Sequence, residues 1–279
     1  MESVEAICIT IDQSNPERGA ITMQNIRSLG FKNAEYFQGV DLRDTPDSVV
    51  KDLLTPRGYY ELKNGREVYE ALSSRGSVGC YLAHVNAWKR CLRDNRELAV
   101  FESDFRVDPS KAGEISKAYT SAKAMGYDLF QFGYITSVDN QFFTVNGTVA
   151  NGRTPVPEIM TGRNILGLAG YFISPRGAAK LLSKVGVSET GGGVGGNIDC
   201  QIDHYINFYQ DYDTTFKRYV TPKTYFDDTQ LPSEIAHGGV EGFGFERTVV
   251  KRYPGLLFVS AGVMMIVLIC LILYIVYKR

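Results

Sequence analysis

Short apolar runs and helical apolar patterns alternate along this chain. Residues 6–11 form an apolar run that stops at the polar residues 12–16, which predicts a strand followed by a loop. A helix is expected over residues 16–29, closed by Gly30, with a second strand at residues 34–40. A strand, a helix and a strand of these lengths predict a parallel pair joined by a right-handed crossover.

The stretch from 74 to 104 carries the clearest pattern of the chain. Apolar residues recur after Gly76 at helical spacing: Val78, Leu82, Val85, Trp88 and Leu92. One face of this helix is therefore expected to pack on a sheet, with Trp88 in the core. A short apolar strand follows at residues 98–101 and stops on Glu102-Ser103-Asp104. The pattern predicts two carboxylates at the carboxyl edge of a sheet, where open α/β folds bind ligands.

The rest of the chain continues the alternation. Residues 41–73 are polar and are expected to be irregular, as is the stretch from 209 to 253. The other predicted elements are a helix at 110–125, a strand at 128–132, hairpins within 139–153, a strand at 166–173, and helices at 175–185 and 199–208. Strands that alternate with helices predict the α/β class with a mostly parallel sheet.

A long apolar segment lies near the end of the chain. Residues 256–277 are 22 consecutive uncharged residues, about 33 Å as a helix, which is enough to span a bilayer. The alternative is a buried core helix. The expected organisation is a globular domain at 1–235, a juxtamembrane linker at 236–255 and a single-pass C-terminal anchor at 256–277.

The flanking charges give a weak indication of orientation. Three basic residues precede the span and two follow it: Arg247, Lys251 and Arg252, then Lys278 and Arg279. The opening residues lack the features of a signal peptide. Together these predict an N-terminal domain on the cytosolic side.

Composition narrows the range of partners. The formal net charge is -1 and no basic stripe is present, so nucleic acid is not an expected partner. The five cysteines are scattered without a C-x-x-C pair, which indicates neither a zinc site nor a disulfide framework. Buried thiols in a reducing compartment are the simpler interpretation.

The strand end at Glu102 and Asp104 indicates the chemistry. Mn²⁺ and Mg²⁺ favour carboxylate oxygens, and a bound diphosphate can complete their coordination. The stretch therefore predicts metal-assisted handling of a nucleotide diphosphate. The alternative is an acidic turn that merely follows a strand.

Several segments together resemble glycosyltransferase family 25, the lipooligosaccharide and collagen β-galactosyltransferases. The similar segments, in the order of the family, are AICITIDQSNPERGAITMQNIRSLGFKNAEYFQGVD, GSVGCYLAHVNAWK, AVFESDF, AGYFISPRGAAKLL and NIDCQIDHYI. The resemblance implies a GT-A fold and inverting transfer of a hexose, galactose or glucose, from a UDP-sugar donor to a hydroxyl with Mn²⁺ or Mg²⁺. The acceptor would be a glycan, a lipid or a glycoprotein.

The resemblance also suggests roles for individual residues. Asp104 would bind the metal, and Glu102 would be a second ligand or would orient donor hydroxyls. Ser103 departs from the family, where an acidic residue is usual, and this keeps open a non-catalytic, membrane-anchored sugar-binding or scaffold protein. A nucleotide-sugar hydrolase is a third interpretation.

A base is expected among the later residues. Asp199 and Asp203 are four residues apart and would share one helix face, where paired carboxylates can raise one pKa. His204 would complete the metal shell or bind diphosphate, or be structural. The alternative for the two aspartates is a helix cap and a solvated face.

Three further features stay open. His84 matches a family position and would have a structural or a donor-pocket role. Arg18 would contact phosphate or simply be solvated. The glycine run at 191–196 would be a mobile lid or a plain linker.

Overall fold

The computed structural model describes residues 1–11, 16–66, 68, 70–136, 140–143, 158–184 and 198–226, with the backbone alone at 16–18. The helices are α1 (Pro16–Ser28), α2 (Asp47–Asp52), α3 (Pro56–Asn64), α4 (Arg75–Asp94), α5 (Ala112–Ala124), α6 (Pro175–Leu182) and α7 (Ile202–Tyr212). The strands are β1 (Glu5–Thr10), β2 (Asn33–Gln38), β3 (Leu98–Glu102), β4 (Leu129–Ile135), β5 (Gln141–Phe143), β6 (Met160–Arg163), β7 (Leu166–Ile173) and β8 (Arg218–Val220).

The strands form one mixed sheet in the order β2-β1-β3-β7-β4-β8-β6-β5. The predicted parallel pair of β1 and β2 is confirmed, and β1–β3 and β4–β8 are also parallel. The expectation of a mostly parallel sheet is wrong, because β7 lies antiparallel between β3 and β4 and the β6 pairings are antiparallel too. Nearly all of β7 is buried, and an apolar run buried on both faces gives no sign of its direction.

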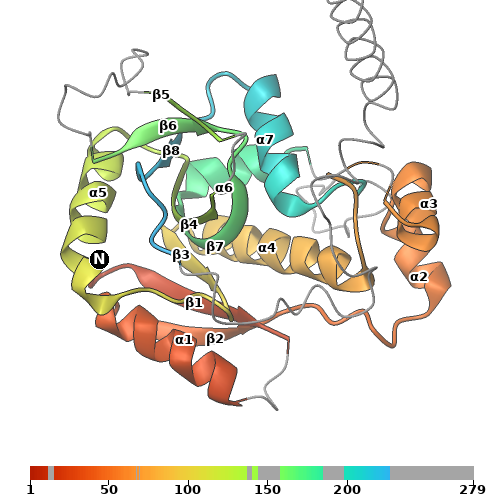
Figure 1. Cartoon of the computed structure of the whole chain (residues 1–279), viewed down its shortest axis with the longest axis horizontal. Helices are drawn as coiled ribbons and strands as arrows, with labels where there is room; N and C mark the ends of the chain where they lie inside the picture. Colours follow the sequence, from red (N-terminus) through yellow and green to blue (C-terminus); the bar gives the residue numbers. More distant parts are fainter. Residues whose placement is uncertain are drawn as a thin grey trace, which may run out of the picture.

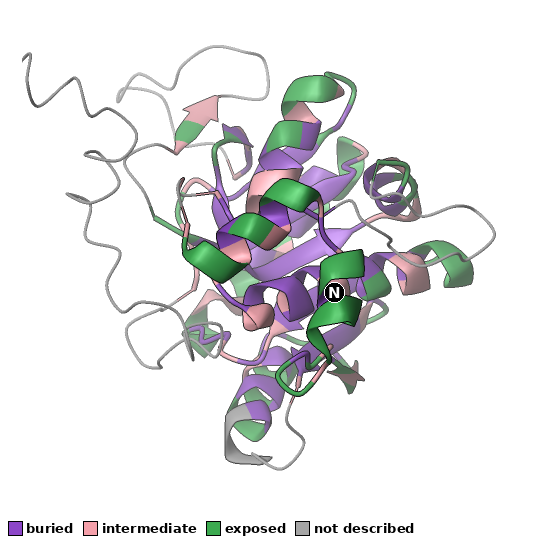
Figure 2. Ribbon diagram, turned by 90° about the vertical axis from the view of Figure 1, so that its right-hand side faces the viewer, coloured by how far each residue is buried: buried purple, intermediate pink, exposed green. Residues whose placement is uncertain are grey.

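Helices cover both faces of the sheet (Figure 1). On one face α4, α6 and α7 pack against apolar residues such as Ile9, Val100 and Ile173. On the other, α1 and α5 pack against Phe101 and Phe130. Buried residues run through the sheet and the inward sides of the helices, while exposed residues lie on the outer sides (Figure 2). Because side chains alternate along β3, Glu102 falls on the same face as Val100, the face that α4 covers.

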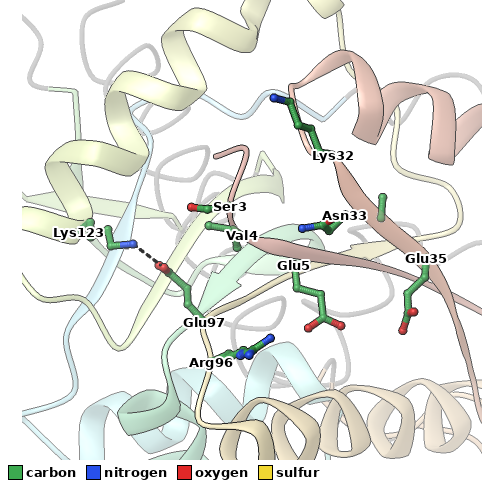
Figure 3. A pocket seen from close by; sticks show the side chains of 10 residues that line it. Ser3, Val4, Glu5, Lys32, Asn33, Glu35, Arg96, Glu97 and Lys123 are labelled. Atoms are coloured by element: carbon green, nitrogen blue, oxygen red, sulfur yellow. Dashed lines mark hydrogen bonds and ion pairs between the residues drawn. The ribbon is translucent and has the colours of Figure 1, made fainter.

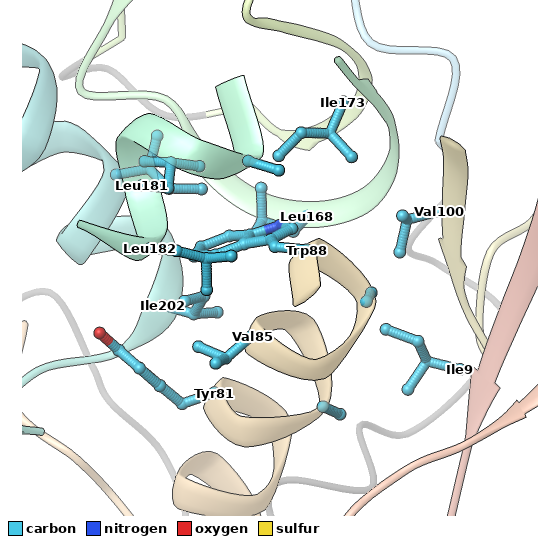
Figure 4. Packing of buried hydrophobic residues seen from close by; sticks show 14 of the residues in the cluster. Ile9, Tyr81, Val85, Trp88, Val100, Leu168, Ile173, Leu181, Leu182 and Ile202 are labelled. Carbon is cyan, nitrogen blue, oxygen red and sulfur yellow. The ribbon is translucent and has the colours of Figure 1, made fainter. Parts of the chain in front are cut away.

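α4 is the longest helix in the described part of the chain and has a clear cap at each end. Ser74 caps its first turn through a reciprocal hydrogen-bond pair with Ser77, and Asn95 ends it in the left-handed conformation (φ 47°). Trp88 is fully buried on its inner face, among side chains of β7 and α6 such as Leu168 and Leu182, which confirms its predicted place in the core (Figure 4).

Some other expectations are wrong, and some concern residues that the structure does not describe. Residues 41–73 contain α2 and α3, and the stretch after 209 contains β8, so neither stretch is irregular throughout. The predicted linker at 236–255, the membrane span at 256–277 and the glycine run at 191–196 lie outside the described residues. Within the part of the chain that the structure describes, no helix is long and apolar enough to cross a membrane.

Candidate functional site

The site predicted from the sequence lies at one edge of the sheet. Ile9 of β1 is in register with Glu102, the last residue of β3, and Ile135 at the end of β4 pairs with Leu166 at the start of β7. The carboxyl ends of β1, β3 and β4 and the beginning of β7 therefore share this edge. It is where open α/β sheets hold their ligands.

Glu102 is held by a buried polar network. Its Oε1 lies 3.2 Å from Nε2 of His84, whose Nδ1 lies 2.9 Å from the hydroxyl of Tyr171. The Trp88 indole N–H donates to the same hydroxyl at 3.0 Å. His84, Tyr171 and Trp88 are fully buried, whereas 23% of the Glu102 side chain is exposed. The network thus leads from the core to a carboxylate at the surface of the site.

Three carboxylates are within electrostatic range of Cys80, which lies one helical turn before His84. Burial raises the pKa of the Cys80 thiol well above its ordinary value, and the charges of Glu102, Asp203 and Asp104 raise it further. Asp203 of α7 reaches the same edge, because it binds the N–H of Gly167 at the start of β7. Such carboxylates are the anionic groups that a site for a cation needs.

The turn after β3 is fastened to the opposite layer of the protein. The buried Thr22 hydroxyl of α1 donates to the Ser103 carbonyl at 2.5 Å. The Arg106 guanidinium donates to the Thr22 hydroxyl at 2.6 Å and to the Phe105 carbonyl at 2.8 Å. Ser103 is itself only 7% exposed, whereas Asp104 is partly exposed. Ser103 is thus a packed residue of the turn that carries Asp104.

The two predicted bases are not a helical pair. α7 begins at Ile202, so Asp199 precedes the helix and the expected shared face is wrong. A parallel bridge between Ile198 and Leu54 precedes Asp199, which is exposed. Asp203 lies in the first turn of α7, where its Oδ2 accepts from the Gly167 N–H at 2.9 Å and its Oδ1 from the His204 N–H at 2.8 Å.

These contacts of Asp203 shape the neighbouring turn. Gly167 has a positive φ of 73°, a conformation that favours glycine. The Gly167 N–H donates to the Asp203 carboxylate, and the Gly167 carbonyl accepts from the side-chain amide of Gln131. A carboxylate in the first turn of α7 also interacts favourably with the helix dipole. Asp203 therefore joins α7 to the start of β7 at the same edge as Glu102.

His204 lies in the first turn of α7, next to Asp203, whose Oδ1 accepts from its N–H. The His204 ring lies 6.5 Å from that of Phe208, one turn along α7. Glu102, Asp104 and His204, the predicted metal ligands, do not bring their ligand atoms to within 4.8 Å of one another; among the described residues Cys80, His84 and Glu102 do so. Arg18 lies in the first turn of α1, just after β1.

The chemical type of the metal-ligand atoms decides which cation would suit the site. A thiol and an imidazole are soft ligands that suit Zn²⁺ better than Mn²⁺ or Mg²⁺. Both ring nitrogens of His84 are already in hydrogen bonds. Glu102 and Asp104, by contrast, are partly exposed residues at the strand end, and their carboxylates fit a hard cation.

A separate hollow of about 640 Å³ lies at the opposite edge of the sheet (Figure 3). Val4, Asn33 and Glu97 place it at the starts of β1, β2 and β3. In it Glu97 binds Lys123 at 2.8 Å and also accepts from the Tyr127 hydroxyl. Its charges are thus partly neutralised within the protein, and it is remote from the carboxylates at the ends of the strands.

Sequence reasoning overlooked Cys80 and Tyr171 as parts of the site. Cys80, His84 and Trp88 are spaced by four residues, which was a usable signal that they share a helix face. No such signal existed for Tyr171, because its contact with His84 depends on β7 lying next to β3. The roles of Thr22 and Arg106 likewise depend on how α1 packs.

The fold is a mixed α/β sheet with helices on both faces and carboxylates at the carboxyl end of one of its strands. The family model for glycosyltransferase family 25 (LPS biosynthesis protein) matches residues 8–190, and the chain belongs to this family.

Curated relatives carry the same family name. A "Glycosyltransferase 25 family member" of Aedes aegypti is 27% identical over 179 residues, which are 62% of this chain and 27% of that protein. A bovine relative, 27% identical over 150 residues (52% of this chain and 23% of that protein), is named "Probable inactive glycosyltransferase 25 family member 3". The chain thus spans about a quarter of the length of the curated relatives it matches.

Solved structures resemble the chain only distantly. A UDP-glucose pyrophosphorylase from Acinetobacter baumannii aligns with 80% of this chain and 87% of its own at 10% identity, with a TM-score of 0.42. A likeness at this level supports no conclusion about activity.

Proposed function

We propose that this chain is a glycosyltransferase that moves a hexose, galactose or glucose, from a UDP-sugar to a hydroxyl acceptor with inversion at the anomeric carbon. The observation that carries the proposal is that Glu102 and Asp104 lie at the end of β3, at the edge of the sheet where Asp203 binds the Gly167 N–H at the start of β7. Membership of glycosyltransferase family 25 supplies the reaction class. The mixed α/β sheet is interpreted here as a GT-A-type donor-binding fold.

Glu102 and Asp104 are the residues that would hold Mn²⁺ or Mg²⁺. A bound divalent cation would offset the negative charge of the departing UDP. Asp104 is placed by the turn that Thr22 and Arg106 fasten, and Glu102 by its hydrogen bond to His84. Arg18, in the first turn of α1, would add a positive charge for the diphosphate.

The transfer needs a base for the acceptor hydroxyl. The hydroxyl oxygen forms a bond to the anomeric carbon while the bond from that carbon to the diphosphate oxygen breaks, and a carboxylate takes the hydroxyl proton. Asp203 and Asp199 are the candidates. Asp203 lies nearer the strand-end carboxylates through its contact with Gly167, whereas Asp199 is the more exposed.

A membrane tether fits an acceptor that is itself a membrane glycan, lipid or glycoprotein. Residues 256–277 are the proposed anchor, with the N-terminal domain on the cytosolic side. Confinement would raise the local concentration of such an acceptor. Alkaline extraction tests the tether: the full chain should stay in the membrane pellet, and its release into the supernatant would contradict the proposal.

The enzyme proposal is tested by UDP release from a panel of UDP-sugars, with and without Mn²⁺, by wild type and Asp104→Asn. The expected result is metal-dependent turnover of one donor that falls by about 100-fold or more in the variant. Donor and Mn²⁺ binding are followed in the same samples as a rise in melting temperature. A folded wild type that neither binds nor turns over any donor would reject the proposal.

One observation favours a second candidate, a non-catalytic sugar-binding or scaffold protein. Ser103 stands where the family usually has an acidic residue, and one relative carries a name that calls it inactive. Donor binding without turnover in the presence of acceptor would support this alternative. The buried position of Ser103 weighs against it, since the partly exposed carboxylates on either side are retained.

A further inference from the structure

We propose that Trp88, Tyr171 and His84 form a relay of hydrogen bonds that fixes the Glu102 carboxylate in the orientation that the cation and the donor sugar require. This inference rests on the proposed function and adds three positioning residues to it. None of the three is proposed to touch the reacting atoms. Their effect reaches the site through Glu102 alone.

The hydrogen-bond donor and acceptor groups of these side chains give the relay its direction. An indole N–H can only donate, so the Tyr171 hydroxyl accepts the bond from Trp88. The tyrosine proton is then available to His84 Nδ1, 2.9 Å away. A histidine that accepts at Nδ1 carries its proton on Nε2 in the neutral ring. The Nε2–H consequently donates to Oε1 of Glu102 at 3.2 Å.

The phenol keeps its proton for this purpose. Burial raises the pKa of Tyr171 well above its ordinary value, and the nearby Glu102 charge raises it further. The phenol therefore remains a donor to His84 Nδ1 near neutral pH. The Glu102 carboxylate can only accept, so it favours the same Nε2-protonated tautomer, and the two partners together fix the orientation of the ring.

The position of the relay in the fold explains why it would act on geometry. His84 and Trp88 lie on α4, Tyr171 on β7 and Glu102 at the end of β3, so the relay joins three elements. His84, Trp88 and Tyr171 are fully buried in a packed core that also contains Val85 and Leu168 (Figure 4). Their side chains have little room to move. A partly exposed carboxylate is thus attached to a rigid support, as ligand-binding carboxylates commonly are.

The first test observes the tautomer directly. The chain has three histidines, His84, His204 and His237, so ¹⁵N-histidine NMR of the full chain can be assigned with the single variant His84→Gln. The expected spectrum shows His84 protonated on Nε2 and unprotonated on Nδ1. In Tyr171→Phe the Nδ1 resonance should shift, because Nδ1 loses the hydroxyl that donates to it. A wild-type His84 protonated on Nδ1 alone would overturn the relay.

The second test measures the effect on the site. Mn²⁺ affinity, measured by titration without donor, should weaken about 10- to 100-fold in Tyr171→Phe, the range found for partners that orient metal ligands. Tyr127→Phe is the matched control, because it also removes the hydrogen-bonded hydroxyl of a buried tyrosine, here one that donates to Glu97 at the opposite edge of the sheet. It should leave Mn²⁺ affinity unchanged.

A pair of variants at His84 separates positioning from packing. The side-chain amide of Gln can donate to Glu102 much as Nε2–H does, whereas Leu cannot. His84→Gln should therefore retain Mn²⁺ affinity to within about threefold, and His84→Leu should lose it as Tyr171→Phe does. Equal losses in both His84 variants, or unchanged affinity in Tyr171→Phe, would overturn the proposal.

Failure of the relay can be distinguished from failure of the proposed function. If wild type binds no Mn²⁺ and turns over no UDP-sugar, the proposed function fails and the relay loses its purpose, whatever the tautomer. If wild type binds Mn²⁺ but the tyrosine variant binds it equally well, only the relay fails.

Discussion

At the scale of single residues, the two aspartates proposed as bases differ in what their carboxylates contact. Asp203 accepts two backbone N–H groups, those of Gly167 and His204, and joins the start of α7 to the start of β7. Asp199 is exposed and precedes the helix. A substitution at Asp203 is therefore expected to disturb the fold more than one at Asp199, whose carboxylate contacts the neighbouring Cys200.

This difference gives a prediction for the two alanine variants. Asp203→Ala should lower the free energy of unfolding by about 1–2 kcal/mol, because the partly buried Gly167 N–H loses its acceptor. Asp199→Ala should change it by less than about 0.5 kcal/mol. The alanine substitution of whichever aspartate is the base should also lower kcat by about 100- to 10,000-fold. Urea unfolding and donor turnover on the same samples check both; an Asp203→Ala protein as stable as wild type would contradict the assigned contact.

Much of the site could be predicted at this scale, and the gaps have physical causes. Glu102 and Asp104 follow from a short apolar strand that ends in acids, and that strand is present. Of the three residues Cys80, His84 and Trp88 only His84 was expected at the site, although their spacing along one helix was a usable signal for all three. Tyr171, Thr22 and Arg106 reach the site from distant segments, and no local pattern records contacts between residues more than 80 positions apart.

At the scale of elements, the placement of α4 decides whether Cys80 and His84 reach the strand end. Gly79 lies where the helix meets the carbonyl of Val40, just after β2; a Cβ added there would lie 2.2 Å from that oxygen. The atoms that such a Cβ would meet belong to the backbone of Val40, so no flexible side chain can move aside. Glycine at position 79 is therefore a condition for the close approach of α4.

Substitution of two helical glycines tests this packing. Gly79→Ala should lower the free energy of unfolding by about 1–3 kcal/mol, since α4 must move away from Val40. Gly113→Ala in α5 is the matched control: nothing lies within 4 Å of the added Cβ, so helix propensity should raise stability by up to about 1 kcal/mol. Thermal and urea unfolding compare the two. Equal effects would show that the contact with Val40 does not constrain the helix.

Elements that bury one face were predicted well from the sequence, and elements that bury both faces were predicted poorly. α1, α4 and α6 appear close to their expected places, because apolar spacing, caps and glycines mark them. The direction of β7 was unpredictable, since a strand buried on both faces reads the same either way. β8 has three residues, too few for a period to emerge.

At the scale of the whole molecule, a cluster of charges connects α5 to the last segment that the structure describes. Glu114 accepts from Lys111 and from the Tyr225 hydroxyl, both at 2.9 Å, and lies 3.0 Å from Lys223. These hydrogen bonds, led by that of Lys111, lower the pKa of Glu114 from 4.5 to about 2. The segment after β8 is thereby held against the layer of α1 and α5.

The pH dependence of stability should reflect this cluster. Because the pKa of Glu114 is lower in the folded chain, its contribution is present above pH 4.5 and is lost as the pH falls towards about 2. Glu114→Gln should therefore make the unfolding free energy fall less steeply with decreasing pH in this window. The contribution is small, since the group is exposed. Urea unfolding from pH 5 to pH 2 tests it, and identical slopes in wild type and variant would refute it.

The sequence by itself determined the α/β class, the helix and strand that carry His84 and Glu102, and the family to which the chain belongs. These depend on local periodicity, on caps and turns, and on short motifs. Only the tertiary structure decided the antiparallel insertion of β7, the contact of Asp203 with Gly167 and the network from Trp88 to Glu102. Such contacts join segments that are far apart in the chain, and they form when buried polar groups must find partners in a close-packed core.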